Sequence, residues 1–283
     1  MTDGATPGGP VPGSVPPVVP AGGAGAGACA ACGRPIREGA AFCGFCGHPV
    51  GAPPPPAPRP RESFSALHRR VSREWEEVSF VIKFYVALLA IQIVTAVVIK
   101  AGADEFTAYL VADALLAVVT GAAAAMHWTE VRALLARPAV RPPLFALVLV
   151  AAFPLYGLIH AFVSGLQAAF HVEASRSLDA FEGRGFGWAV FVLCINAAVF
   201  EETAFRGVIF GILRRRVRIA ETLMITSVAF AILHLSVFAL VSHTLLGLYL
   251  GWLRHRSGGL LLPMLAHFLH NGLVLAGERW GTG

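Results

Sequence analysis

The chain has 283 residues, of which 56% are hydrophobic and only 14% are charged. Soluble domains contain roughly 45–50% apolar and about 25% charged residues, so this composition excludes an ordinary soluble domain and indicates a helical membrane protein. The net charge of +5 is small. The basic residues are scattered over loops without interleaved aromatic residues, which argues against nucleic acid as a partner.

Residues 1–28 contain mainly Gly, Ala, Pro and Val, with almost no charge and no periodicity, and we expect them to be disordered. Two C-x2-C motifs follow, at residues 29–32 and 43–46. Four thiolates can form the closed tetrahedral site of a structural zinc ion, and a segment this short would need the metal to fold. We predict a zinc-ribbon module at residues 29–48; a pair of disulfides is the alternative. The predicted ligands are Cys29, Cys32, Cys43 and Cys46.

Residues 49–77 are predicted to link this module to the membrane. The first part, residues 49–60, is rich in proline and should form a semi-rigid, extended spacer. Residues 61–77 are charged, and we expect a short amphipathic helix at the membrane surface.

A transmembrane domain is predicted over residues 78–283, so the fold class is all-α: a polytopic transmembrane helical bundle of about seven spans, preceded by a small zinc ribbon. The spans are predicted from apolar runs long enough to cross, or nearly cross, a bilayer. They lie at about residues 79–99, 106–127, 144–163, 187–213, 219–235, 237–253 and 259–277.

Arginines gather in alternate loops, which predicts the orientation of the chain. If the spans alternate, the segments before the first span and between spans two and three, four and five, and six and seven share one side. This side should be cytoplasmic, which places the N-terminus and the zinc module in the cytoplasm and the C-terminus outside. Its basic residues are Arg69, Arg70, Arg73, Arg132, Arg137, Arg141, Arg214, Arg215, Arg216, Arg218, Arg254 and Arg256.

Charged residues also lie inside the fourth span. Each charge at the bilayer centre costs about 2.5–3.5 kcal/mol, whereas one Leu, Ile, Phe or Val returns only about 0.3–0.6 kcal/mol. Glu201, Glu202 and Arg206 should therefore belong to a buried polar site instead of a lipid-facing surface. Glu202 and Arg206 are four residues apart, so they share a helix face and can pair.

Two further polar sets stand at helical spacing on later spans: Phe230 with His234, and His267 with Asn271. Measured along the helices from the predicted cytoplasmic ends, Glu201, His234, His267 and Asn271 lie roughly 20, 22, 12 and 18 Å deep. They can therefore meet in one layer. A Glu and a neutral His can take a proton from water, and a second His and an Asn amide can donate to an oxyanion. Hydrolysis also requires these helices to line a wet cavity.

These three sets resemble the motifs of the CPBP family, which contains CAAX proteases and bacteriocin-processing enzymes and is also called Abi. The resemblance covers about residues 186–277. It implies an intramembrane glutamic endopeptidase in which Glu201 is the general base acting with His234. By the same resemblance, His267 and Asn271 form the oxyanion hole, while Glu202 and Arg206 support the site or bind substrate. The implied partners are membrane lipid and a peptide or protein substrate.

Two alternatives remain open. The first is a zinc-dependent form of the same peptidase with Glu201, His234 and His267 as ligands. The family has been described as metal-dependent, but the resemblance favours the form without a catalytic metal, and the chain also lacks the H-E-x-x-H spacing of common zinc peptidases. The second is a transporter, or an immunity or scaffold protein that only binds its partner. His160, His243 and Cys194 are interpreted as packing residues, and His270 is expected to face away from Asn271.

Overall fold

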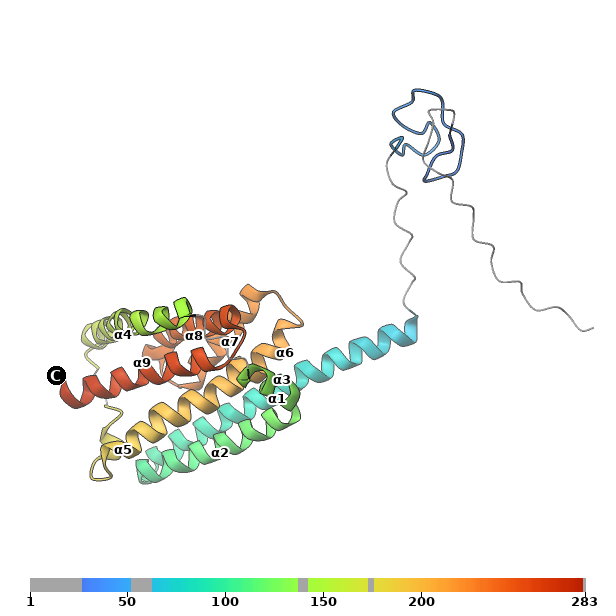
Figure 1. Cartoon of the computed structure of the whole chain (residues 1–283). Coiled ribbons are helices and arrows are strands. Elements are labelled where there is room, and N and C mark those ends of the chain that lie inside the picture. Colours follow the sequence, from blue (N-terminus) through green and yellow to red (C-terminus); the bar gives the residue numbers. More distant parts are fainter. Residues whose placement is uncertain (1–26, 52–62, 137–141, 173–175, 282–283) are drawn as a thin grey trace, which may run out of the picture. The chain divides into compact units, whose positions relative to one another are not determined.

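The computed structural model describes residues 27–51, 63–136, 142–172 and 176–281 (Figure 1). The chain forms two compact units, Met1–Ser63 and Phe64–Gly283. Within the described residues the regular structure is helical, and β-structure is limited to two isolated bridges. The predictions for residues 1–26, for most of the proline-rich spacer and for Arg137 and Arg141 fall outside the described residues.

The described part of the N-terminal unit, residues 27–51, contains two copies of the same turn. In the first copy the Gly33 amide donates to the Cys29 carbonyl at 2.8 Å, and in the second the Gly47 amide donates to the Cys43 carbonyl at 2.9 Å. Gly33 and Gly47 have φ values of 72° and 73°, a conformation that side chains with a Cβ rarely adopt. An isolated bridge flanks each turn, pairing Ala28 with Pro35 and Phe42 with Pro49. The two C-x2-C motifs are thus held as a structural repeat.

The second unit is a helical bundle. A continuous helix runs from Phe186 to Arg214 and is built from α5, η2, η3 and α6. The elements in chain order are α1 (Phe64–Lys100), α2 (Glu105–Met126), α3 (Trp128–Leu135), α4 (Pro142–Phe170), η1 (Asp179–Phe181), α5 (Phe186–Ala189), η2 (Val190–Glu201), η3 (Thr203–Ile209), α6 (Phe210–Arg214), α7 (Ile219–Leu233), α8 (Val237–Ser257) and α9 (Leu261–Trp280).

The bundle confirms the all-α fold class. Within the described residues, five helices are long and apolar enough to cross a membrane: α1, α2, α4, the Phe186–Arg214 helix and α8. Two of the seven predicted spans differ from these five. α7 is a shorter apolar helix of 15 residues, and α9, with 20 residues, does not meet the same criteria of length and composition. The predicted break near Ser236 is confirmed, because Ser236 caps the start of α8.

The first helix also differs from expectation. Residues 64–77 do not form a separate surface helix; they are the first turns of α1, which continues unbroken for 37 residues. The sequence from Phe64 to Lys100 contains neither Gly nor Pro, so nothing ends the helix between its charged and apolar parts. At 1.5 Å per residue α1 is about 55 Å long, well beyond the hydrocarbon thickness of about 30 Å.

The segments predicted to share one side of the membrane meet at one end of the bundle. Arg216 pairs with Glu74 at 3.2 Å and with Glu77 at 2.7 Å, and Arg215 pairs with Glu130 at 3.0 Å. These contacts connect the start of α1, helix α3 and the loop after α6. The amide of Leu260, between α8 and α9, also bonds to the carbonyl of Leu134 at the end of α3.

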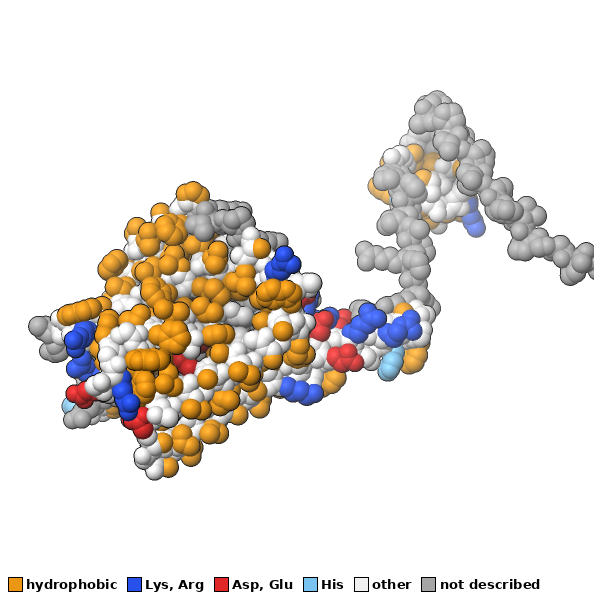
Figure 2. All heavy atoms as spheres, turned by 60° about the horizontal axis from the view of Figure 1, so that its bottom comes forward, with side chains coloured by type: hydrophobic (Ala, Val, Ile, Leu, Met, Phe, Trp, Pro, Cys, Tyr) orange, Lys and Arg blue, Asp and Glu red, His pale blue; other side chains and the backbone are white. Residues whose placement is uncertain are grey.

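The opposite end of the bundle holds the remaining connections. Arg184 lies 3.5 Å from Asp104, and the carboxylate of Glu278 accepts bonds from the amides of Ser177 and Leu178. Figure 2 shows hydrophobic side chains over most of the visible surface of the helical unit, with charged side chains gathered mainly toward its two ends. The two ends therefore match the predicted alternation of the loops. The assignment of one end to the cytoplasm stays a prediction from the arginine distribution.

The helix that carries the first motif lies in the middle of the bundle. η2 packs against α2 and α9, and η3 packs against α2, α7 and α8. In Figure 1 this helix, yellow to orange, runs between α2 and α9. All residues of η3 are buried, and the core around them includes Phe205 and Phe230. The charged motif is consequently enclosed by protein.

Candidate active site

The first motif lies where two π-helical stretches meet. Glu201 is the last residue of η2, and Glu202 stands between η2 and η3. π-helical turns are rare and occur frequently at functional sites. The sequence pattern predicted a helix here but gave no signal for the wider winding.

Glu202, Arg206 and His267 form a buried group. Nη1 of Arg206 and Nδ1 of His267 each lie 2.9 Å from the same oxygen, Oε1 of Glu202. The side chains of Glu202 and Arg206 are fully buried, and that of His267 is 2% exposed. Arg206 also donates to the Gly247 carbonyl at 3.1 Å. The predicted pairing of Glu202 with Arg206 is confirmed, and the group connects the first motif to α8 and α9.

Phe230 lies at the centre of the motif residues. Its ring centroid is 4.5 Å from the Arg206 guanidinium carbon, 4.8 Å from the His234 ring and 5.7 Å from the His267 ring. Phe205 packs edge-on against it at 5.4 Å. Residues of all three motifs therefore surround one fully buried aromatic side chain.

His234 is held at the turn between α7 and α8. Its Nδ1 lies 2.9 Å from the Phe230 carbonyl. Because a carbonyl only accepts, Nδ1 carries the hydrogen and Nε2 is left as an acceptor in the neutral ring. Leu235 follows with φ of 51°, a left-handed conformation uncommon for a bulky side chain, and the Ser236 hydroxyl then accepts from the Ala239 amide. This turn fixes where the imidazole lies.

Glu201 and Glu202 each have a buried Oε2 without a hydrogen-bond partner among the described residues. Glu202 is also held through Oε1 by Arg206 and His267. The Glu201 carboxylate, by contrast, bonds to no described side chain, although the residue is partly exposed. Glu201 interacts electrostatically with His267, Glu202 and Arg206. No direct hydrogen bond joins it to His234 within the part of the chain described. A buried carboxylate oxygen without a partner is costly and calls for a water, a proton or a substrate group.

Asn271 connects α9 to the motif helix. Its amide nitrogen donates to the Leu193 carbonyl in η2 at 2.7 Å. An amide group has two N–H donors, so one remains for another acceptor.

Two polar features near the site were not predicted. The ring of His243 in α8 lies 4.1 Å from that of His234, and its Nδ1 is 3.0 Å from the Ala239 carbonyl. In α2, Asp113 accepts a hydrogen bond from Asn196 of η2 at 3.2 Å and interacts electrostatically with Glu201. The cost of a charge in an apolar span, which singled out Glu201, would also have identified Asp113. His243 gave no such signal, because its neighbour comes from another helix.

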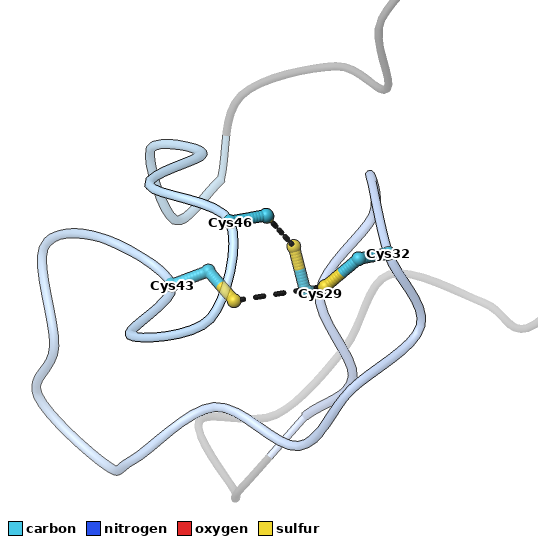
Figure 3. A group of neighbouring side chains, drawn as sticks. All are labelled: Cys29, Cys32, Cys43 and Cys46. Carbon is cyan, nitrogen blue, oxygen red and sulfur yellow. Dashed lines mark hydrogen bonds between the residues drawn. The ribbon is translucent and has the colours of Figure 1, made fainter.

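The four N-terminal cysteines form a separate cluster (Figure 3). Their sulfur atoms all lie within 4.8 Å of one another, with 3.6 Å between Cys29 and Cys46 and 3.7 Å between Cys32 and Cys43. Zinc–sulfur bonds of about 2.3 Å in a tetrahedron imply sulfur separations of about 3.8 Å, so the group fits this ion. All four cysteines are free, so the alternative of two disulfides is not observed.

The backbone prepares one of these cysteines for metal binding. Hydrogen bonds from the backbone at Phe45 and Cys46 lower the pKa of Cys43 to about 6, which favours the thiolate that a metal requires. Among the described residues, this cluster is the one group of three or more Cys, His, Asp or Glu side chains gathered closely enough to hold a metal ion. The module can therefore bind a metal.

Comparison with known proteins gives one match. Residues 183–273 match the family model described as type II CAAX prenyl endopeptidase, Rce1-like. The matched segment contains all three motifs and confirms the family resemblance there, over less than half of the chain. No curated protein and no solved structure matches the chain. The match indicates a protease, and together with the apolar helices it indicates an integral membrane protein.

Proposed function

We propose that the protein is an intramembrane endopeptidase in which Glu201 and His234 activate a water molecule for attack on a peptide bond. The observation that carries this proposal is that the Glu201 carboxylate, with its buried and unpartnered Oε2, bonds to no described side chain although it interacts electrostatically with His267 and Arg206. The match of this segment to a peptidase family supports it. A site that activates water needs a proton acceptor that is not already hydrogen-bonded to another side chain.

The chemistry follows from the available acceptors. Oε2 of Glu201 and Nε2 of His234 would each accept a hydrogen from one water molecule. As the water oxygen attacks the carbonyl carbon, one of these groups takes the proton, and it later returns the proton to the leaving amine. The fixed Nδ1 contact of His234 keeps Nε2 as the acceptor through this sequence.

His267 and Asn271 would stabilise the oxyanion that forms. The contact of His267 Nδ1 with Glu202 orients the ring, so that Nε2 faces away from the carboxylate and can donate when it carries a proton. The second N–H of Asn271 would be the other donor, since the first is bonded to Leu193. Glu202 and Arg206 would have a supporting role, because their side chains are fully buried and Glu202 holds the His267 ring.

The N-terminal module would hold a structural zinc ion on the cytoplasmic side. The module belongs to another compact unit. The substrate would be a peptide or protein segment that reaches the membrane interior. The family description names prenyl endopeptidases. The site residues proposed here act on a peptide carbonyl and do not require a prenyl group on the substrate.

A proteomic comparison tests this proposal. Cells would express the wild-type chain, the Glu201→Gln variant or the Glu105→Gln variant, which changes an exposed carboxylate at the start of α2. We expect at least one membrane protein to accumulate uncut with Glu201→Gln but not with Glu105→Gln. Identical membrane proteomes for all three would count against a peptidase. A partner that is bound but never cleaved would favour the scaffold alternative.

The zinc-dependent alternative requires its own test. It uses Glu201, His234 and His267 as ligands, whose donor atoms suit zinc, although the structure does not gather these three side chains closely enough to hold an ion. In a variant with Cys29 and Cys43 changed to Ser, any remaining stoichiometric zinc would belong to the membrane unit. Zinc together with activity that a chelator abolishes would favour the metal, whereas full activity of the metal-free protein would support activation by Glu201 and His234 alone.

A further inference from the structure

A row of polar aromatic side chains leads from His234 to the surface of α4. The His234 ring lies 4.1 Å from that of His243 in α8, and α8 packs against α9, which carries His270. Tyr156 of α4 lies 6.5 Å from His270 and stacks on His160 at 5.6 Å with 23° between the rings. Four of these residues lie outside the motif positions, and Tyr156 and His160 lie outside the segment that matches the family.

His270, in the middle of this row of side chains, is buried and has an unsatisfied ring nitrogen. His270 is 8% exposed, and its Nδ1 has no hydrogen-bond partner among the described residues. Buried polar atoms are normally bonded, and an ordered water is the usual partner when the protein supplies none. This position therefore calls for water between α4 and α9.

The outer end of this row of side chains is exposed. His160 is exposed, and it lies about 15 Å from the end of α4 at Phe170, counted at 1.5 Å per residue. Ionisable side chains within apolar spans rarely face lipid and usually face a wet cavity. An exposed imidazole at this depth therefore calls for water beside it.

Gly277 makes room for the Tyr156 side chain. A Cβ at Gly277 would collide with the Tyr156 hydroxyl. The phenol consequently reaches the backbone of α9 about two turns beyond His270, which places its polar end along the same interface.

We propose that His160, Tyr156, His270 and His243 line a hydrated path that supplies water from the surface of α4 to His234. This inference rests on the proposed function, since each hydrolysis consumes one water molecule in a part of the protein surrounded by lipid. The path lies between α4 and the α8–α9 pair, which pack against each other in the bundle.

Cysteine accessibility tests the outer end of the path. The full chain carrying His160→Cys or Leu158→Cys would be reconstituted in lipid vesicles and treated with a charged methanethiosulfonate, with peptide mass spectrometry to separate the new thiol from the native ones. The two positions differ by about 3 Å in depth but face opposite sides of the helix, and Leu158 is 64% exposed. We expect position 160 to react at least about tenfold faster, because only a hydrated thiol forms the reactive thiolate.

A second pair tests the interior. His270→Cys should react faster than Leu275→Cys, since both lie on α9 and are buried but Leu275 packs in an apolar cluster. Equal rates within both pairs would overturn the path whether or not the protein cleaves peptides. Fast labelling of positions 160 and 270 in a protein that cleaves nothing would uphold the path and overturn the peptidase.

Discussion

His267 is bonded through Nδ1 to the carboxylate of Glu202 at 2.9 Å, with both side chains buried. The same carboxylate oxygen holds Arg206. One bond therefore joins the first motif to the last, across residues that are 65 positions apart in the chain. The carboxylate of Glu202 is an internal counter-ion, whereas the neighbouring carboxylate of Glu201 is not bonded to any described side chain.

Replacing Glu202 by Gln should destabilise the membrane unit. The amide leaves the buried Arg206 guanidinium without its counter-charge, which typically costs about 3–5 kcal/mol. Thermal unfolding in detergent measures the effect, with Glu105→Gln as the control for an exposed carboxylate. Equal unfolding temperatures for the two variants would show that the buried pair does not stabilise the fold.

Gly247→Ala should separate α7 from α8. A Cβ at Gly247 would lie 2.9 Å from both Cα and Cβ of Ser227, so the two helices must move apart. Overpacking of this kind costs about 1–3 kcal/mol. Gly121→Ala in α2 is the matched control because its Cβ meets nothing within 4 Å. We expect Gly247→Ala alone to lower the unfolding temperature, and the reverse order would contradict the close helix contact.

Much of the fold could be predicted from sequence, because an apolar run, or a charged residue inside one, can be recognised within a single segment of the chain. The helical bundle, the four-cysteine cluster and the pairing of Glu202 with Arg206 follow from spacing along one segment. The bond between Glu202 and His267 could not be predicted, since both residues had other plausible partners. The ring contact between His234 and His243 depends on how the α7–α8 turn folds, and that turn contains a left-handed Leu235 which no local preference indicates.

Phe230→Leu should reduce activity more than stability. Leu keeps most of the buried apolar volume, and such swaps usually cost less than about 1.5 kcal/mol. The flat ring that contacts Arg206, His234 and His267 would be lost, so the imidazoles would no longer be held in position. Turnover and unfolding temperature, measured on the same purified sample, separate the two effects. Full activity with a large loss of stability would assign Phe230 to packing alone.

Removing the four-cysteine site should affect only the N-terminal unit. We expect one zinc ion per wild-type chain and none in a variant with Cys29 and Cys43 changed to Ser, because two of four ligands are lost. The unfolding transition of the helical unit should stay unchanged, since it is a separate compact unit. Metal analysis and calorimetry measure both. A zinc content per chain that is the same in the double variant as in the wild-type protein would disprove the assignment of these cysteines as ligands.

The central claim is that the free carboxylate of Glu201 activates water, and the cleavage rate of purified Glu201→Gln protein tests it most directly. The substrate would be the one identified in membranes, and the unfolding temperature would be recorded in parallel. We predict a rate about 10²–10⁴-fold below that of the wild-type protein, the usual contribution of a general base, with no loss of stability because Oε2 has no partner to lose. Cleavage at the wild-type rate would contradict the account.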